Sequence, residues 1–208
     1  MLFRSTAAAS GAATRALARE DASNLTLLGY GVQGVTHLEA VCAVRKIERV
    51  FIWGPSIDKA AAFAERNAIE GIEMIPIATA REAVRQADVI CAVSNAADPI
   101  VLGEDLSPGC HVNLVGAHSP TTREADPAVF QRSRVYTEIT EFALAEAGDL
   151  IIPINNGEYD ADNIVGELGR LINGDLEGRT SPEDITVYKS LGNTAQDLAA
   201  AEYVMRNA

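Results

Sequence analysis

LTLLGYGVQG, residues 25–34, is the stretch that decides the fold. A short apolar run at 25–28 ends in three glycines with the spacing G-x-G-x-x-G, and apolar residues at helical spacing follow. This order predicts a strand, a tight turn and a helix. The glycine spacing alone is weak evidence for a ligand, because a plain turn between strand and helix can use the same residues. The strand before it and the helix after it strengthen the prediction.

Each glycine of this turn has its own predicted role. Gly29 permits the turn, Gly31 lets a pyrophosphate approach the backbone, and Gly34 lets the helix pack close to the strand. Together with Val32 and Gln33 they place a helix N-terminus, with its free N–H groups, against the phosphates. We therefore predict a dinucleotide-binding turn. The alternative is a turn without a ligand.

The composition argues against several function classes. Of the 208 residues, 48% are hydrophobic, which is enough for a substantial core. The net charge of −12 argues against nucleic acid and against an anionic membrane surface as partners. No apolar run approaches the roughly 20 residues of a membrane span. Cys42, Cys91 and Cys110 lie in apolar segments without metal-ligand spacing, so we expect no metal site, reduced thiols and a cytoplasmic protein.

Strand and helix signals alternate through the first two thirds of the chain. Strands are expected at 25–28, 50–53, 72–75, 89–93, 110–115 and 135–137, and helices at 32–44, 57–67, 79–86 and 127–131. Strands that are apolar on both sides and alternate with helices indicate a parallel sheet covered on both faces. With right-handed crossovers, the predicted fold class is α/β, a doubly wound, mostly parallel Rossmann-type sheet with an α-rich C-terminal return.

Three segments are expected along the chain. Residues 1–20 form a lead-in helix, 21–150 the NAD(P)-binding Rossmann domain, and 151–208 the C-terminal helices and strand. The first nineteen residues, rich in alanine and arginine without an acid, also imitate a mitochondrial transit peptide, but we favour the helix. After residue 148 we expect an edge segment at 149–153, a helix through 164–172, a strand at 185–188 and a helix at 198–205.

Several short phrases, taken in order, carry a resemblance. They are AAAS at 7–10, the glycine turn with its glutamine, DPI at 98–100, HVNLVG at 111–116, RE at 123–124, GDL at 148–150, GEL at 166–168, GDLEGR at 174–179, ITVYKSLG at 185–192 and DLAA at 197–200. Together they resemble the ornithine cyclodeaminase/mu-crystallin family over essentially the whole chain. Each phrase is unspecific alone, and the combination is specific.

The resemblance implies a Rossmann domain that binds NADP or NAD and acts on a small amino or imino acid. Members of that family include ornithine cyclodeaminase, alanine dehydrogenase and reductases of cyclic ketimines such as pyrroline-2-carboxylate. Their shared chemistry is hydride exchange between C4 of the nicotinamide and the α-carbon of the substrate. In the cyclodeaminase the cofactor is regenerated within one turnover, whereas a reductase delivers the hydride once.

The start of the chain departs from the family pattern. Family members carry a substantial segment before the alanine-rich helix, which supplies much of the substrate pocket and the dimer interface. This sequence begins almost inside that helix, so it resembles the nucleotide-binding half of an enzyme: a truncated product, a mis-called start or a degenerate paralogue. Arg4 is the early candidate for a substrate carboxylate, one residue before the family's arginine position, which Ser5 occupies. The resemblance allows a homodimer, and we expect weak or no pyrroline-2-carboxylate reduction by this chain alone.

The second departure is at the family's catalytic acid. An aspartate follows the Val-Gly strand end in the cyclodeaminase, and His118 occupies that position here. Histidine titrates near neutrality and can protonate an imine while hydride arrives, whereas activation of water suits a carboxylate better. His118 is therefore the candidate catalytic residue and favours an imine reductase over a deaminase. The alternative is an ordinary loop histidine.

The third departure concerns the choice of cofactor. NAD sites usually place Asp or Glu about twenty residues beyond the glycines, and NADP sites place a cation there. The second strand ends in WGPS at 53–56, with neither. Ser56 opens the next helix, where its hydroxyl and the free N–H groups could bind a phosphate. Asp58 is read as a first-turn helix acid. The sequence favours NADP.

Further positions follow from the match. Those expected to approach the cofactor are Ser94, Asn95, Val115, Ser190, Leu191 and Gly192. A plain turn is the alternative for the first two, and strand-to-helix punctuation for the last three. Lys189 begins the phrase that resembles the family's nicotinamide loop, but we favour a solvated strand-end charge for it. Glu138, Glu141 and Glu146 are read as a solvated helix face. His111 is read as a core histidine and His37 as structural or exposed.

Three functional hypotheses remain from the sequence. The first is an NAD(P)-dependent oxidoreductase acting on a cyclic imine or amino acid. The second is a cyclodeaminase-type lyase, which the missing aspartate disfavours. The third is a nucleotide-binding protein without catalysis, in the manner of the crystallin-like members of the family.

Overall fold

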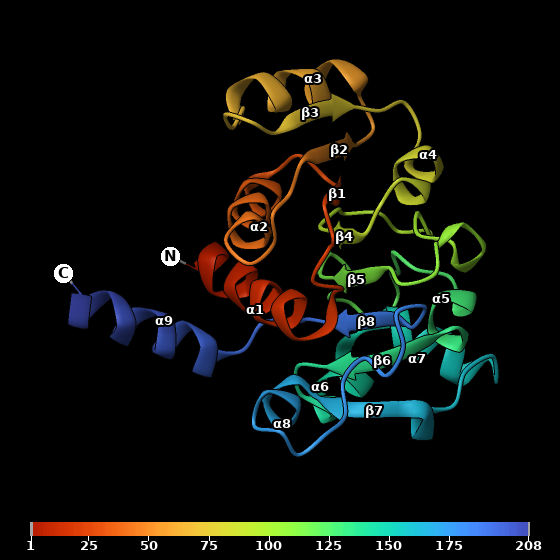
Figure 1. The fold of residues 1–208 in the computed structure, drawn as a ribbon. Coiled ribbons are helices and arrows are strands. Elements are labelled where there is room, and N and C mark those ends of the chain that lie inside the picture. The colour runs from red at the N-terminus through yellow and green to blue at the C-terminus, as the bar shows by residue number, and fades with distance from the viewer. Residues whose placement is uncertain (1, 208) are drawn as a thin grey trace.

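The protein is described by a computed structural model, which covers the backbone of residues 2–207 and the side chains of residues 4–207. Its centre is an eight-stranded sheet with the order β3-β2-β1-β4-β5-β8-β6-β7 (Figure 1). The strands are β1 Asn24–Leu28, β2 Arg49–Trp53, β3 Glu73–Pro76, β4 Val89–Ala92, β5 His111–Leu114, β6 Ser133–Thr137, β7 Ile164–Glu167 and β8 Ile185–Lys189.

Nine α-helices and two 3-10 turns surround the sheet in the described part of the chain. The helices are α1 Leu2–Leu17, α2 Val32–Cys42, α3 Ile57–Arg66, α4 Ala80–Arg85, α5 Pro127–Gln131, α6 Thr140–Glu146, α7 Gly148–Asn155, α8 Leu168–Ile172 and α9 Thr194–Asn207, and the turns are η1 Gly103–Asp105 and η2 Ala161–Asn163. The lead-in helix predicted for the first twenty residues is thus present as α1.

Every strand pair in the sheet is parallel. At the centre, Leu25 of β1 lies opposite Val50 of β2 on one side and Val89 of β4 on the other. The chain runs outward from β1 to β3, then returns to β4 on the other side of β1. This reversal is the topological switch point of a doubly wound fold, and it confirms the predicted fold class.

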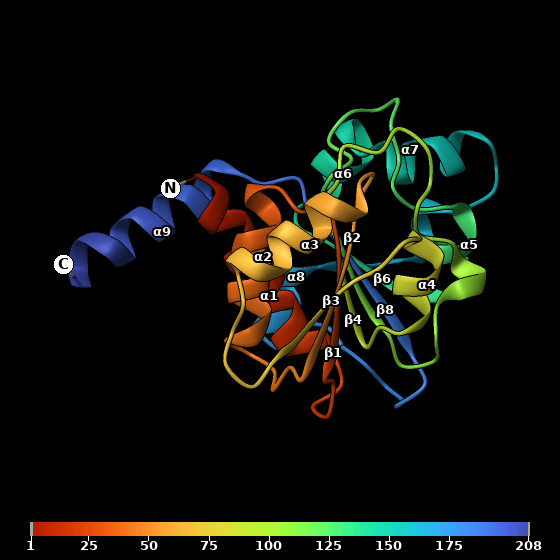
Figure 2. The same ribbon diagram turned by 90° about the horizontal axis from the view of Figure 1, so that it is seen from above.

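The two faces of the sheet have separate cores, because neighbouring side chains of a strand point to opposite faces. Leu25 and Leu27 of β1 pack with α2 and α3 residues such as Leu38 and Phe63. Leu28 packs with the α4 residue Val84 in the other cluster. Figure 2, seen from above, shows α1, α2 and α3 on one side of the sheet and α4 and α5 on the other. This two-faced covering explains why the strands read as continuous apolar runs.

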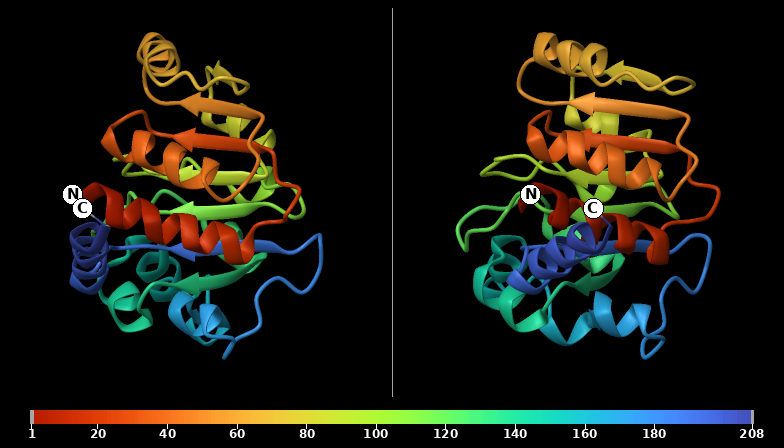
Figure 3. Two further views of the ribbon diagram at one scale, coloured as in Figure 1. Left: turned by 60° about the vertical axis from the view of Figure 1, so that its left-hand side comes forward. Right: turned by 90° about the vertical axis from the view of Figure 1, so that its left-hand side faces the viewer.

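Helix α9 lies at the surface of the fold. It leaves the end of β8 and runs beside α1, with both termini on the same side of the molecule (Figure 3). Ser5 Oγ of α1 donates to Asp197 Oδ1 at 2.5 Å. No residue of α9 is buried, and Leu198, Tyr203 and Met205 are exposed. None of the described helices has the length and apolar character that a bilayer crossing needs.

Two sequence predictions in the C-terminal part were wrong. The predicted edge segment at 149–153 lies within helix α7, because a short apolar run does not distinguish a strand from a buried helix. The predicted helix through 164–172 is divided into strand β7 and the short helix α8. β7 pairs with β6 at the edge of the sheet, so tertiary pairing overrode the four apolar residues at helical spacing. Residues 151–208 thus supply two strands of the same sheet.

Candidate functional site

The glycine turn joins β1 to α2, and packing requires two of its glycines. Gly29 has φ +127°, and a Cβ there would lie 2.7 Å from the carbonyl oxygen of Val93. A Cβ on Gly34 would lie 2.6 Å from the carbonyl oxygen of Gly29. Backbone approaches this close exclude a side chain at either position. The predicted roles of Gly29 in the turn and of Gly34 in helix packing agree with these contacts.

Gly31 has a different environment. It is the N-cap of α2, with φ −82° and ψ −165°, a conformation open to any residue. A Cβ built there meets no described atom within 4 Å. Gly31 offers no side-chain cap, and the first N–H groups of a helix, here at Val32 and Gln33, have no intrahelical partner. An open approach to unpaired amides is the geometry that a diphosphate needs.

A cavity of about 390 Å³ adjoins this turn. It lies at the carboxyl ends of β1, β2 and β4, and Tyr30, Trp53, Pro55 and Asn95 are among the residues that line it. The Tyr30 ring covers Gly54, where a Cβ would lie 2.1 Å from a ring carbon. The cavity therefore offers aromatic walls next to the glycine turn, at the switch point where doubly wound sheets bind nucleotides. A nucleotide cofactor fits these residues.

Ser56 caps helix α3 beside this cavity. Its Oγ accepts a hydrogen bond from the backbone N–H of Lys59 at 3.4 Å, and Asp58 lies in the first turn of the helix. The reading of Asp58 as a first-turn helix acid is confirmed. Because the cap uses Ser56 Oγ as an acceptor, its hydroxyl hydrogen remains for a ligand. A role of Ser56 in holding a 2′-phosphate stays a prediction.

Glu124 is a buried carboxylate that sequence reasoning missed. Its Oε1 accepts from the backbone N–H and the hydroxyl of Ser94, at 2.8 and 2.6 Å, and its Oε2 accepts from Gly116 N–H at 2.6 Å. Burial raises the pKa of Glu124, and the Ser94 hydrogen bonds act against this shift. Glu124 thus ties the loop after β4 to the loop after β5. The only sequence signal was the Arg-Glu pair at 123–124.

The predicted cofactor positions at these loops are arranged around Glu124. Both hydrogens of Ser94 are donated to that carboxylate, and Ser94 Oγ also accepts from Ala96 N–H at 3.1 Å. Asn95 lines the cavity. Val115 N–H completes the ladder to Ala92 O at 2.9 Å. Contact of Ser94, Asn95 and Val115 with a cofactor stays a prediction. In this arrangement Ser94 has no hydrogen left to donate to a ligand.

His118 lies just beyond the end of β5, and its side chain is exposed. Its Nδ1 lies 2.8 Å from the carbonyl oxygen of Gly116. Since a carbonyl oxygen can only accept, Nδ1 has the hydrogen in this arrangement, and proton exchange falls on Nε2. The structure therefore places an accessible imidazole at the carboxyl edge of the sheet. Its catalytic role stays a prediction.

Lys189 is fully buried, so its reading as a solvated strand-end charge was wrong. Its Nζ lies 3.0 Å from Asp149 Oδ2 and donates to the carbonyl oxygen of Ala117 at 2.7 Å. Asp149 Oδ1 in turn accepts the N–H groups of Glu124 and Ala125, at 2.7 and 3.1 Å. A lysine at a strand end does not by itself indicate a buried acidic partner. That partner, Asp149, lies in helix α7, which was predicted as an edge segment.

Glu138 was wrongly predicted on a solvated helix face. It is half-buried between β6 and α6, and its carboxylate accepts hydrogen bonds from the Leu191, Gly192 and Asn193 region after β8. Glu141 and Glu146 are exposed on α6, as predicted. The predicted cofactor positions Ser190, Leu191 and Gly192 therefore form a loop that Glu138 holds, and their contact with a cofactor stays a prediction.

Arg4 lies on the surface between α1 and α2. It forms an exposed ion pair with Glu39 of α2, with an N–O distance of 3.4 Å, and lines a shallow groove with the small residues of the two helices. The proposed role of Arg4 in binding a substrate carboxylate stays a prediction.

His37 and His111 have structural environments, in agreement with the sequence readings. His37 Nδ1 lies 2.8 Å from Gln33 O, and its Nε2 lies 3.0 Å from Ser10 Oγ of α1. Burial lowers the pKa of His37 to about 4. His111 is fully buried, and burial lowers its pKa to about 3. The side chains described, those of residues 4–207, include no group of three or more His, Cys, Asp or Glu that could hold a metal ion.

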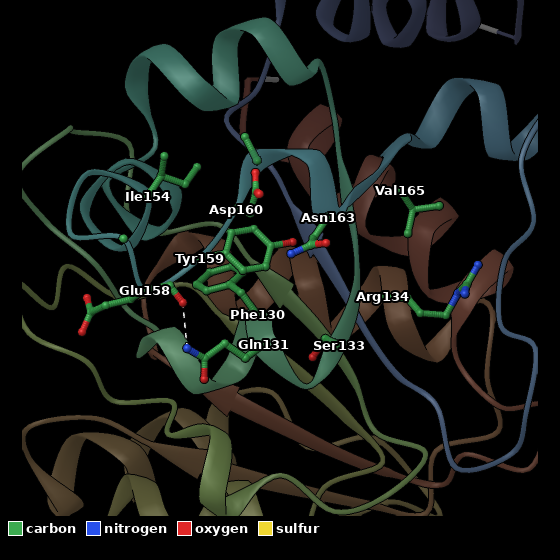
Figure 4. A pocket seen from close by; sticks show the side chains of 12 residues that line it. Phe130, Gln131, Ser133, Arg134, Ile154, Glu158, Tyr159, Asp160, Asn163 and Val165 are labelled. Carbon is green, nitrogen blue, oxygen red and sulfur yellow. Dashed lines mark hydrogen bonds between the residues drawn. The ribbon is translucent and has the colours of Figure 1, made fainter.

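A larger cavity of about 850 Å³ lies at the opposite edge of the sheet, where β6 and β7 begin (Figure 4). The Phe130 and Tyr159 rings meet there, with centroids 5.7 Å apart and a 50° tilt, and Gln131 Nε2 donates to Glu158 O at 2.7 Å. Because the strands are parallel, this cavity lies at their amino ends and the glycine turn at their carboxyl ends. The larger cavity is therefore separate from the candidate site.

Comparison with known proteins extends these observations. The family model for the ornithine cyclodeaminase/mu-crystallin family matches residues 3–208. The chain is 40% identical over 205 residues to a Delta(1)-pyrroline-2-carboxylate reductase of Bacillus cereus, covering 98% of this chain and 63% of the relative. It is 35% identical over 199 residues to the ketimine reductase mu-crystallin of Mus musculus, covering 96% of this chain and 60% of that protein.

Solved structures show the same similarity. The Thermococcus litoralis Delta(1)-pyrroline-2-carboxylate reductase in complex with NADH and L-proline superimposes with a TM-score of 0.92 at 36% identity, over 95% of this chain and 62% of that one. An archaeal alanine dehydrogenase dimer with bound NAD gives a TM-score of 0.91 at 30% identity, over 98% of this chain and 62% of that one.

The chain thus spans less than two thirds of the length of these relatives. Within that span, the family model matches almost the whole chain, and the parallel sheet and the glycine turn are consistent with this match. The chain belongs to the ornithine cyclodeaminase/mu-crystallin family.

Proposed function

We propose that this chain binds NADP or NAD at the glycine turn and that the whole protein is an oxidoreductase. The reaction would transfer a hydride to or from the α-carbon of a small cyclic imino or amino acid. The observation that supports it best is the open approach to Gly31, where a Cβ meets nothing within 4 Å while the neighbouring glycines are tightly packed. The reductases among the relatives support the reaction class.

Different residues at the carboxyl ends of the strands would bind different parts of the cofactor. The N–H groups at Val32 and Gln33 would hold the diphosphate, and the cavity beside Tyr30 and Trp53 would take the adenosine. The nicotinamide half would then extend toward the loops after β4, β5 and β8. When bound, the reduced nicotinamide supplies the hydride. His118 would donate a proton to the imine nitrogen from Nε2.

A cyclic ketimine such as pyrroline-2-carboxylate is the proposed substrate class. The carboxyl group of such a substrate needs a fixed cation, and Arg4 is the candidate within this chain. A histidine in place of the cyclodeaminase aspartate supports proton donation to an imine over the activation of water. A reductase is therefore proposed ahead of a cyclodeaminase-type lyase.

For the cofactor we propose a preference for NADP over NAD. The end of β2 has the sequence WGPS at 53–56, with no carboxylate to repel a 2′-phosphate. Ser56 caps α3 with a hydroxyl hydrogen left over, and the first turn of that helix has free N–H groups. The relatives of known structure contain NADH or NAD, so the preference needs a direct measurement.

We also propose that the whole protein forms a homodimer in the cytoplasm. The exposed apolar side chains of α9, which include Leu198, Tyr203 and Met205, support burial of that helix in an assembly. The described cysteines are free thiols, in agreement with a reducing compartment. A net charge of −12 supports a small molecule rather than nucleic acid as the partner.

Fluorescence titration of the chain with NADH and with NADPH tests the binding proposal. We expect saturable binding of both, with the tighter constant for NADPH. Absence of saturation at millimolar concentration of either cofactor would refute the site. The reaction is tested by following NADPH oxidation with pyrroline-2-carboxylate in a protein of the relatives' full length, and no oxidation there would refute the substrate class.

A further inference from the structure

Glu138 makes an unusual set of contacts with the loop that follows β8. Its Oε2 accepts the backbone N–H groups of Leu191 and Gly192, at 2.9 and 2.7 Å. Its Oε1 accepts from Asn193 Nδ2 at 2.5 Å. Its own N–H donates to Lys189 O at 3.1 Å. Ser190 Oγ also donates to Oε2, at 3.4 Å. One side chain therefore receives donors of four consecutive residues, and hydrogen bonds to a carboxylate are stronger than those between neutral groups.

The loop has other contacts at its start, where Ser190 is fully buried and donates its N–H to Leu114 O at 3.0 Å, and where Leu191 packs against the core. It lies between β8, whose last residue Lys189 is fully buried, and α9, which has no buried residue. Gly192 has φ +82°, so the loop turns through a conformation that favours glycine. Asn193 Oδ1 accepts from Gln196 N–H at 3.0 Å and so links the loop to the start of the helix. Beyond the buried Ser190, the Glu138 carboxylate holds the N–H groups of Leu191 and Gly192 and the side chain of Asn193.

The place of the loop connects it with the cofactor. The strand order puts the end of β8 next to the end of β5, which leads to His118, and on the far side of β4 from the glycine turn. A dinucleotide whose diphosphate lies at that turn and whose adenosine fills the cavity beside β2 extends its other half toward β4, β5 and β8. The loop 190–193 thus faces the nicotinamide end.

We propose that Glu138 is a positioning residue, which fixes the loop 190–193 in the shape that receives the nicotinamide end of the cofactor. The inference rests on the proposed function. Glu124 uses the same device one step away, where it takes the N–H groups of Ser94 and Gly116. The carboxylates of Glu124 and Glu138 already accept the N–H groups of these loops. The loops therefore do not compete with the N–H groups at the start of α2 for the diphosphate. Glu138 acts through the loop and does not touch the cofactor.

The test compares Glu138→Ala, Glu138→Gln and a matched control, Glu141→Ala, which removes an exposed carboxylate from the neighbouring helix. Each is titrated with NADH and with ADP-ribose, which lacks the nicotinamide. For Glu138→Ala we expect NADH affinity to fall about tenfold or more, since hydrogen bonds to a charged group are lost. ADP-ribose affinity should change less than about twofold, because its contacts lie at the glycine turn and adenosine cavity. Glu138→Gln keeps one carbonyl acceptor and should restore part of the NADH affinity, and the control should match the wild type.

Hydrogen exchange at Leu191 and Gly192 provides a readout that needs no cofactor. The Ala variant should lose protection at these two amides while the amides of β8 stay protected, which separates release of the loop from unfolding. If the wild type binds neither ligand, the proposed function fails, and the positioning role fails with it. If the wild type binds both and the Ala variant loses the two affinities equally or neither, only the role of Glu138 is overturned.

Discussion

Lys189 Nζ lies 3.0 Å from Asp149 Oδ2, and both side chains are fully buried. The pair joins the end of β8 to the first turn of α7, and Lys189 also donates to Ala117 O in the loop that leads to His118. A charge pair without solvent contact is not strong evidence for stability, because desolvation opposes the attraction. The pair also fixes the loops at the candidate site. Lys189 binds the carbonyl oxygen of Ala117, and Asp149 accepts the N–H groups of Glu124 and Ala125.

Removal of one charge should therefore destabilise the protein. Asp149→Asn keeps an oxygen for the Glu124 and Ala125 amides but removes the carboxylate charge that contacts the buried lysine. We expect a loss of about 3–5 kcal/mol in the free energy of unfolding, measured with denaturant. The double variant Asp149→Asn with Lys189→Met removes both charges and should recover much of this loss. Equal destabilisation by the single and double variants would show that the pair contributes through shape alone.

Substitutions at Gly31 and Gly34 should affect different properties, namely NADPH binding at Gly31 and the stability of the fold at Gly34. Gly31→Ala and Gly31→Phe should fold with nearly wild-type stability, because the backbone conformation is ordinary and the Cβ meets open space. Both should weaken NADPH binding, the larger side chain more, since it would occupy the pyrophosphate position. Gly34→Ala is the contrasting variant, because its Cβ would lie 2.6 Å from Gly29 O and should destabilise the fold.

Thermal unfolding and fluorescence titration on the same samples check this separation. Unaltered NADPH affinity in Gly31→Phe would mean that the diphosphate is bound elsewhere.

Cofactor preference should respond to charge at Ser56. Ser56→Asp keeps an N-cap acceptor for helix α3 and adds a negative charge where a 2′-phosphate is proposed. NADPH affinity should fall about tenfold or more while NADH affinity changes little, because only NADPH has that phosphate. Ser56→Asn, which caps without a charge, should leave the ratio of the two constants unchanged. A parallel loss for both cofactors in Ser56→Asp would place the 2′ position away from this helix.

The acid stability of the protein should depend on His37. Burial lowers its pKa from 6.5 to about 4, so the unfolded chain binds the proton more readily than the folded protein does. The stability that neutral His37 permits is therefore full above pH 6.5 and falls as the pH drops toward 4. Each such group contributes a slope of up to about 1.4 kcal/mol per pH unit in this window.

Denaturant unfolding between pH 7 and pH 4.5 measures the slope. His111, whose pKa burial lowers to about 3, contributes in the same direction. His37→Gln should reduce the slope by the equivalent of one proton relative to the wild type. A variant with an unchanged slope would show that His37 is protonated in the folded protein.

Local pattern predicted much of this protein. The strand, turn and helix at 24–42 follow from an apolar run and glycine spacing, which act over a few residues. The strand at 89–92 follows from a continuous apolar run, because a parallel sheet covered by helices buries both faces of such a strand. The open space at Gly31 agrees with the role that the motif assigns to it, and that role stays a prediction.

Long-range contacts decided the rest. Lys189 and Ala117 are 72 positions apart, and Glu138 and Gly192 are 54 apart. Whether a lysine or a glutamate is solvated or buried depends on partners that the chain brings in only after folding, and no spacing rule records them. β7 likewise became a strand because β6 offered an edge. The sequence by itself determined the layers of the sheet and the glycine turn. Tertiary packing determined that Lys189 and Asp149 are buried, that Glu138 is half-buried, and that these side chains hold the loops of the site.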